Sequence, residues 1–464
     1  MKRPLSTGLL LQWSVVAVTL LYSASLPVTT NDLHIYLAMG RWMAEQGQLM
    51  EVEAFTWTIP GTPFVNGTWG FSALSWQLHE AFGLRGLQLL NGALVGLAVW
   101  VSARSALLLG ADRRAAAIGA LYAFALLFQN TTVRGQTFVF PLFAAMLWWS
   151  LRARSPAGSL LVGVLGGSLW GALHGSFPAG LAALGLLAAS RLRGPGGAWM
   201  TPALVCLGLV VGVCIGPYGP SIWVYVLENG SLPRERDFLE WASPTLQSFE
   251  GARFYASLVL WGLLSAASLR RRRLPRGLLP VLAFAALACT GIRFVAWFGL
   301  LSAPFFAAAL PLSTDRGLPR PLVRAVEGVA LVLWALFLIR GLQPRDRILS
   351  WDTPVELLEA LPHQGRILNP PELGGAIVVM RPQLLIGHDI RTWIYDDAAW
   401  SLYLELSEGA PGWEQRLQDL EVDHLLLTED FHGEGLLPAA LASPAWRVVS
   451  RTEQGALLTR VSPR

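Results

Sequence analysis

The chain has 464 residues, of which 53% are hydrophobic and 14% are charged, and its mean hydropathy is +0.46. These values exclude an ordinary soluble globular protein and predict a polytopic α-helical membrane protein. The pI near 9.2 does not indicate nucleic-acid binding, because the arginines gather between apolar runs, where they orient membrane helices. Cys206, Cys214 and Cys289 lie within apolar runs and predict neither a metal site nor a disulfide.

The first element is an apolar run of about twenty residues that follows Met1-Lys2-Arg3. It is longer than the apolar core of a signal peptide, and no small-residue cleavage site stands out before Thr29. We therefore expect a retained transmembrane helix.

A polar segment, residues 29–84, follows this run. Gly and Pro interrupt it, so it cannot cross a bilayer, yet it is rich in Trp, Phe, Met and Leu. Two amphipathic helices fit this pattern. The first ends at Gly47 and places on one face Tyr36, Met39 and Met43. The second is capped by Thr68, ends at Gly83 and places on one face Phe71, Leu74, Leu78 and Phe82.

Amphipathic helices of this kind lie along a membrane surface with their apolar faces in the lipid. We expect Asp32, Glu51 and Glu53 to sit just outside the lipid. The segment is then the lip of an active site.

The remaining apolar runs complete a transmembrane domain over residues 1–342, with about eleven helices. The runs begin near Leu9, Gly86, Ala115, Gln136, Gly158, Phe177, Trp199, Arg253, Gly277, Arg293 and Leu322. Arginines gather in alternate loops, which are cytoplasmic by the positive-inside rule. The N-terminus is then cytoplasmic. The other loops and the C-terminal segment face outward from a bacterial inner membrane.

Residues 343–464 differ from the rest in composition, because Asp, Glu, His and Pro become frequent and no run is long enough to span. They predict a small α/β domain outside the membrane, large enough for its own core. Short helices are expected at Thr353–Leu361 and Trp413–Leu420. Strands are expected at Ala376–Val379, Leu384–Ile386, His424–Leu427, Trp446–Val449 and Ala456–Leu458.

The candidate site residues are polar groups at the outward ends of apolar runs. Such groups are costly to place at a membrane boundary, so several on one side indicate a site. They are Asp32, Arg134, His174, Arg236, Glu240, Trp241 and Arg293. Structural roles compete with this interpretation: a helix cap for Asp32, backbone satisfaction for His174, interface anchors for the arginines and a solvated helix for residues 233–241.

Several short motifs occur in a set order along the chain. The polar segment carries an acid, then FTWT and PFVNGTW. The later motifs are Trp170 to His174-Gly175, Pro217-Tyr218-Gly219, Glu240-Trp241, Arg293, Gly374-Gly375 and Asp389-Ile390-Arg391. This order resembles that of bacterial GT-C-type membrane glycosyltransferases, a group that includes protein O-mannosyltransferases and lipid A aminoarabinose transferases. The likeness is greatest to the uncharacterised bacterial members of the group.

The resemblance implies a transferase that takes a sugar from a polyprenyl-phosphate carrier, with Asp32 as the base on the acceptor hydroxyl. Arginine forks suit the departing phosphate, so Arg134, Arg236 and Arg293 are its candidate ligands, and His174 assists the phosphate or orients Asp32. Glu240 and Trp241 are candidate substrate contacts. The acceptor is a glycan, lipid or protein. A divalent metal on carboxylate oxygens stays an alternative.

Two other functions remain open. A non-catalytic relative would bind a lipid-linked glycan and serve as an assembly or export partner. It is favoured by departures from the family pattern at Asn31, Tyr36 and Thr68, where we expect an acid, a histidine and an acid. A secondary transporter would place polar residues at the bilayer midplane, whereas these lie at one face. Asp389 and Arg391 are expected to form an internal ion pair.

Overall fold

The computed structural model describes residues 7–29, 31–228, 241–270, 272, 274–310, 320–342, 349–350 and 353–461. Its contacts divide the chain into two compact units. The helical unit comprises Met1–Leu26 and Arg85–Arg345, and the α/β unit comprises Pro27–Leu84 and Asp346–Arg464. The first polar segment, which the sequence analysis assigned to the transmembrane domain, therefore groups with the C-terminal residues.

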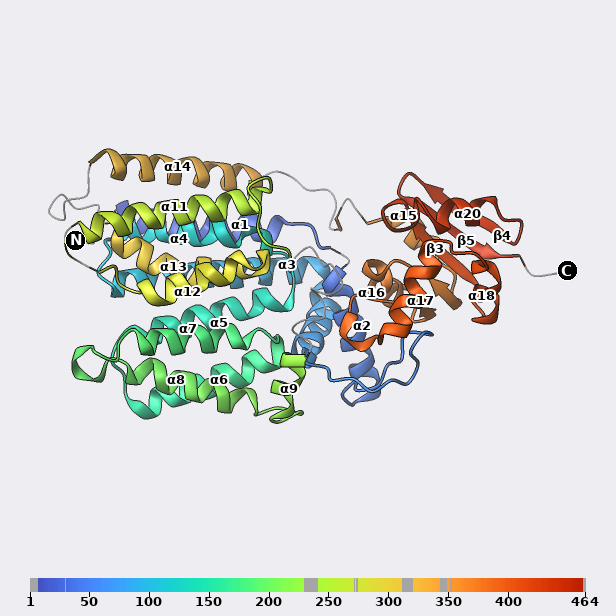
Figure 1. Cartoon of the computed structure of the whole chain (residues 1–464), viewed down its shortest axis with the longest axis horizontal. Helices are drawn as coiled ribbons and strands as arrows, with labels where there is room; N and C mark the ends of the chain where they lie inside the picture. Colours follow the sequence, from blue (N-terminus) through green and yellow to red (C-terminus); the bar gives the residue numbers. More distant parts are fainter. Residues whose placement is uncertain are drawn as a thin grey trace. The chain divides into compact units, whose positions relative to one another are not determined.

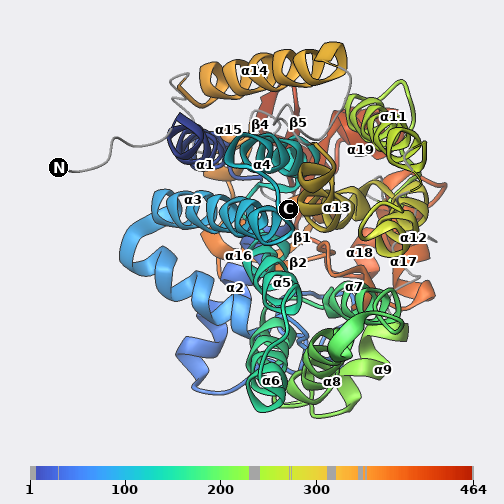
Figure 2. The ribbon, with the colours of Figure 1, turned by 90° about the vertical axis from the view of Figure 1, so that its left-hand side faces the viewer.

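The helical unit is built from helices that run side by side, seen along their length in Figure 1 and end on in Figure 2. They are α1 (Thr7–Ser25), the part of α3 (Trp69–Leu108) after Gly83, α4 (Arg113–Leu127), α5 (Gly135–Ser150), α6 (Pro156–Leu173), α7 (Phe177–Ala189), α8 (Met200–Val213), α9 (Ser221–Glu228), α11 (Phe249–Leu269), α12 (Leu278–Cys289), α13 (Val295–Ala309) and α14 (Arg320–Leu342).

Each predicted apolar run coincides with one of these helices. Among the described residues, four segments are long and apolar enough to cross a membrane: Trp69–Leu108, Pro156–Leu173, Phe249–Leu269 and Ile292–Ala309. The other helices of this unit are shorter or less apolar, so the count of about eleven spans stays a prediction.

Glycines allow α6 and α8 to approach each other closely. A Cβ on Gly163 would overlap the carbonyl oxygen of Val205, and one on Gly208 would overlap that of Leu160. Small residues bring helix backbones into direct contact in membranes in this way. The Gly-rich sequence of this stretch is thus explained by packing.

Gly208→Ala is expected to destabilise the helical unit by about 1–3 kcal/mol, because the added methyl group overlaps the main chain of α6. Gly185→Ala in α7 is the matched control, since a Cβ there meets nothing within 4 Å. Thermal unfolding of both variants in detergent measures the effect. Equal midpoints for the two variants would contradict the packing account.

The α/β unit contains one five-stranded mixed sheet in the order β2-β1-β3-β5-β4. The strands are β1 (Gln364–Leu368), β2 (Gln383–Ile386), β3 (His424–Thr428), β4 (Trp446–Thr452) and β5 (Gly455–Arg460). β1 is parallel to β2 and β3, whereas β5 is antiparallel to β3 and β4. The helices are α2 (Asn31–Gln46), the first part of α3, α15 (Val355–Glu359), α16 (Pro371–Met380), α17 (Asp397–Ser407), α18 (Trp413–Asp419), α19 (Glu429–His432) and α20 (Leu436–Ala442).

Four of the five predicted strands are confirmed as β2 to β5, and the two predicted helices as α15 and α18. The strand predicted at Ala376–Val379 is wrong, because these residues lie in α16. Pro371 occupies the first turn of this helix, where its missing N–H costs nothing. A short apolar run that is buried on all sides does not distinguish a helix from a strand by periodicity. The sequence analysis also missed β1.

The polar segment adds an edge to this sheet beside β2. Thr56 pairs in parallel with Ile386, and the main chain of Ile386 is bonded on both sides: its N–H donates to Phe55 O (2.9 Å) and its O accepts from Trp57 N (3.0 Å). The Trp57 indole then enters the sheet's hydrophobic core and donates from Nε1 to Ile367 O at 3.0 Å. The expectation that residues 343–464 build a core of their own is therefore incomplete, since Trp57 is part of it.

Candidate functional site

Asp32 lies in the first turn of α2, and its side chain lies outside the described part of the structure. The helix ends as predicted at Gly47, which has a φ of +67° and donates its N–H to Met43 O at 2.9 Å. The second predicted helix begins at Trp69, directly after Thr68, and is interrupted at Gly83, where φ is +63°. The local sequence, with Gly at the helix ends, was sufficient to predict the stops at Gly47 and Gly83.

The burial of α2 differs from the prediction. Residues 33–40 are buried all round the helix, so α2 does not present one polar and one apolar face. A Cβ on Gly40 would overlap the Ser72 carbonyl of α3, and the Tyr36 ring packs edge-on against Phe71 at 5.4 Å between centroids. Protein side chains, rather than lipid alone, cover the faces that α2 turns towards α3.

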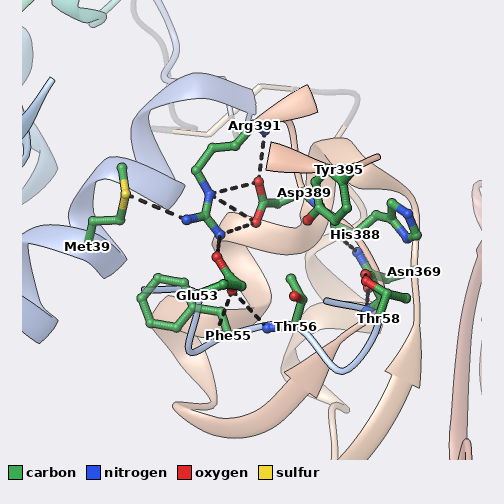
Figure 3. Close-up of polar contacts among 11 residues, drawn as sticks. Met39, Glu53, Phe55, Thr56, Thr58, Asn369, His388, Asp389, Arg391 and Tyr395 are labelled. Carbon is green, nitrogen blue, oxygen red and sulfur yellow. Dashed lines mark hydrogen bonds and ion pairs between the residues drawn. The ribbon is translucent and has the colours of Figure 1, made fainter. Parts of the chain in front are cut away.

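Three charged side chains meet in the interior of the α/β unit: Glu53 from the polar segment, and Asp389 and Arg391 from the chain after β2 (Figure 3). The Arg391 Nη2 lies 2.7 Å from Glu53 Oε2 and 2.6 Å from Asp389 Oδ2, and its Nε donates to Asp389 Oδ1 at 3.0 Å. The predicted Asp389–Arg391 ion pair is confirmed. Glu53 is not a surface acid, because it is only 3% exposed. Its expected position just outside the lipid stays a prediction.

Main-chain N–H groups also donate hydrogen bonds to this cluster. The second carboxylate oxygen of Glu53 accepts from the N–H groups of Phe55 (2.7 Å) and Thr56 (2.9 Å). Burial alone would lower the pKa of Arg391, but the charges of Asp389 and Glu53 outweigh it and raise that pKa above its ordinary value. Arg391 is therefore a permanent cation enclosed by the protein. The cluster is suited to holding the polar segment against the C-terminal residues, not to proton transfer.

His174 directly follows α6, with an extended backbone. Its Nδ1 accepts the N–H of Ser176 at 3.1 Å, so the neutral imidazole carries its proton on Nε2. The same serine accepts a hydrogen bond from Trp170 Nε1 at 3.1 Å, and the fully buried Trp170 stacks on Trp297. The Trp-to-His motif thus builds the turn between α6 and α7 and fixes the histidine ring.

Arg293 and Trp241, predicted from separate segments, lie together. The Arg293 guanidinium carbon lies 4.2 Å from the centre of the Trp241 ring, in a cation–π contact. The main chain supports this contact, because Ile292 N donates to Ala242 O at 2.9 Å. The Trp241 ring also meets Phe294 edge-on. The short helix η4 (Ile292–Phe294) is therefore fixed against the chain after residue 240.

Arg134 directly precedes α5, and its carbonyl oxygen accepts both the N–H (3.0 Å) and the hydroxyl (2.7 Å) of Thr137. Beside it, the amide of the buried Asn91 donates to Thr131 O at 2.6 Å. The other predicted phosphate ligand, Arg236, lies outside the described residues, as does Glu240. His174, Arg134, Trp241 and Arg293 all belong to the helical unit, whereas Asp32 belongs to the α/β unit.

Sequence reasoning missed the roles of Trp57, Asn91 and the Glu53–Arg391 pair. For Asn91 a signal exists, since an amide within an apolar run needs a partner. Trp57 and Glu53 meet partners more than 300 residues away, and no local pattern carries that information. Among the described residues, no group of three His, Cys, Asp or Glu side chains is placed to hold a metal ion.

Stability of the α/β unit is expected to fall as the pH rises through 7, because burial raises the pKa of Glu372 in α16 from 4.5 to about 7. The neutral carboxyl contributes fully below pH 4.5, and this contribution is lost once the carboxyl ionises in the folded protein. At about 1.4 kcal/mol per tenfold change in proton affinity, the shift from 4.5 to about 7 limits the loss to roughly 3.5 kcal/mol. Unfolding of Glu372→Gln should vary less between pH 5 and 8 than that of the wild type, and parallel profiles would refute this assignment.

No protein-family model and no curated protein matches this chain. Solved structures do resemble it. ArnT from Cupriavidus metallidurans in the apo state has a TM-score of 0.62 at 13% identity, and the match covers 98% of each chain. ArnT bound to undecaprenyl phosphate gives a TM-score of 0.59 with the same identity and coverage.

Two larger proteins are similar as well. The apo oligosaccharyltransferase from Archaeoglobus fulgidus has a TM-score of 0.56 at 13% identity, over 90% of this chain and 70% of its own. The mycobacterial arabinofuranosyltransferase AftD has a TM-score of 0.58 at 18% identity, over 98% of this chain and 40% of its own. These likenesses confirm the predicted GT-C-like fold and, together with the apolar helices, a membrane location.

Proposed function

We propose that this GT-C-like membrane protein is a glycosyltransferase that moves a sugar from a polyprenyl-phosphate carrier to an acceptor hydroxyl. One observation carries the proposal: the fold matches ArnT bound to undecaprenyl phosphate over 98% of both chains. We place the reaction on the outer face of a bacterial inner membrane, with the N-terminus in the cytoplasm. The alternating arginine-rich loops support this orientation.

In the proposed reaction, the acceptor oxygen attacks the anomeric carbon of the carrier-bound sugar. Asp32 takes the acceptor proton, the bond from the anomeric carbon to the phosphate oxygen breaks, and the carrier leaves as a phosphate anion. Arg134, Arg236 and Arg293 are proposed to stabilise that anion. The Trp241 ring under Arg293 supports such a role by holding the guanidinium in place.

His174, Glu240 and Trp241 are proposed as supporting residues on the substrate side. Because Nδ1 of His174 accepts from Ser176, its Nε2–H is the group that can donate to a phosphate oxygen. A divalent metal on carboxylate oxygens stays an alternative, and the proposed reaction assigns no step to it.

A non-catalytic binding or export partner is the second candidate, and one position favours it. Tyr36 stands where the resemblance leads us to expect a histidine, and its ring is packed against Phe71 in the α/β unit. A residue that packs in the core thus stands where we expect a histidine that takes part in the reaction. Such a protein would bind the lipid-linked glycan and present it to other components without turning it over.

Native mass spectrometry of the protein purified with its own lipids tests these proposals. A retained polyprenyl-phosphate sugar that disappears on adding candidate glycan, lipid or protein acceptors supports the transferase. A retained carrier that no acceptor consumes supports the binding partner. If no polyprenyl lipid is retained, both proposals lose their basis and transport assays follow.

A further inference from the structure

We propose that α16 and the Glu53–Arg391–Asp389 cluster position the first turn of α2, so that the C-terminal residues set where the main chain of Asp32 lies. This inference rests on the proposed role of Asp32 as the base. It assigns Gly375, Arg391 and Arg41 as positioning residues, which touch α2 or belong to it and act through it.

The closest approach is at Gly375. A Cβ there would overlap the backbone N of Ile35 and lie 2.9 Å from the carbonyl carbon of His34. Only a glycine allows α16 to reach the α2 main chain at this point, one turn after Asp32. The neighbouring Gly374 faces the other way, towards the backbone of His388 and the side chain of Asp389. The Gly-Gly motif thus places α16 between α2 and the chain after β2, which carries Asp389.

Two further contacts fix the rest of α2. Arg41 donates from Nη2 to Val378 O (2.8 Å) and from Nη1 to Val379 O (3.1 Å), which are carbonyls in the last turn of α16. Between Ile35 and Arg41, Met39 of α2 presents its sulfur to Arg391 Nη1 at 3.8 Å. This contact lies on the side of the guanidinium away from Asp389 (Figure 3). Helix α2 is therefore held at residues 35, 39 and 41 by α16 and the charged cluster.

Rigid attachment matters more for a helix that carries a catalytic base than for a helix that carries no reacting group. A base must stay within a fraction of an ångström of its productive position, and a displacement of about 1 Å costs on the order of 10²-fold in rate. Carrier binding does not depend on the acceptor base in the proposed reaction. Displacing α2 is therefore expected to lower kcat without changing retention of the carrier.

The test compares Gly375→Ala and Arg41→Met with Leu417→Ala in the full-length protein in nanodiscs. Leu417 is a fully buried core residue of α18, so its truncation destabilises the unit without touching α2. Hydrogen–deuterium exchange of residues 33–40 reports on α2, native mass spectrometry on the carrier, and a single-turnover assay on transfer. Gly375→Ala and Arg41→Met are expected to speed exchange in α2 and to slow transfer, by about 10²-fold for Gly375→Ala, with the carrier retained. Leu417→Ala should lower the unfolding midpoint and leave transfer unchanged.

Unchanged exchange in both Gly375→Ala and Arg41→Met would overturn the proposal, because α16 would then not hold α2. Equal effects of Leu417→Ala on exchange and transfer would overturn it too, since general stability would explain them. If the wild type transfers no sugar, the proposed function fails instead. The exchange data then decide independently whether α16 holds α2.

Discussion

Asp32→Asn is expected to lower sugar transfer by about 10²–10⁴-fold, the usual contribution of a positioned general base. Asparagine has nearly the same shape as aspartate, but it cannot accept the acceptor proton at neutral pH. The carrier should remain bound, because the proposed phosphate ligands are arginines elsewhere in the chain. Single-turnover transfer and native mass spectrometry on the same preparation measure both quantities.

The matched control is Glu80→Gln, which removes an exposed carboxylate from the same α/β unit and should leave transfer intact. A full rate in Asp32→Asn would refute the assignment of the base while leaving a transferase possible with another one. Equal losses in both variants would point to the overall negative charge of this unit rather than to one residue.

The elements that could be predicted are those whose causes are local. The apolar runs predicted where the helices of the helical unit lie, because each run is continuous in the sequence. Gly47 and Gly83 marked helix breaks because a positive φ favours glycine at that very residue. Asp389 and Arg391 were recognised as a pair since they stand two residues apart.

What escaped prediction depends on partners that are distant in the sequence. Ala376–Val379 lies in α16, which packs against α2, and α2 is more than 300 residues away in the sequence. The local apolar pattern therefore does not show that these residues form a helix rather than a strand. Glu53 looks like a surface acid until Arg391 is placed beside it. The FTWT motif was recognised as a family signature, but its physical role, an added sheet edge with Trp57 in the core, follows only from the pairing with Ile386.

The candidate site residues could be predicted in part. Arg293 and Trp241 were chosen separately, as polar and aromatic residues at the outward ends of apolar runs, and the structure brings them into contact. His174 was chosen for its motif, and its ring is fixed by Ser176. The place of each residue near a helix end was predictable from the apolar pattern. The orientation of each side chain was not, because neighbouring turns determine it.

Arg391→Leu is expected to destabilise the α/β unit by about 3–5 kcal/mol, the usual cost of leaving buried charges unpaired. The substitution removes the only cation of the described cluster and leaves the carboxylates of Glu53 and Asp389 facing each other in the interior. Glu53→Gln is expected to cost less, about 1–3 kcal/mol, because the Asp389–Arg391 pair remains and the Gln oxygen can still accept from Phe55 and Thr56. Its amide nitrogen, which is a donor, then replaces the Glu53 oxygen that faced Arg391.

The double variant gives the sharper test, because the charge account predicts the direction in which its stability changes. Adding Glu53→Gln to Arg391→Leu removes one of the two unpaired carboxylates, so the double variant should be more stable than Arg391→Leu alone. Chemical unfolding followed by the fluorescence of Trp57 and Trp446, with the other tryptophans as background, measures all three proteins. Arg391 also packs against Met39 and over the rings of Phe55 and Phe64. Additive losses would mean that Arg391 acts through this packing rather than through charge. A rescue would establish that two acids and one arginine, drawn from opposite ends of the chain, fold as one electrostatic unit.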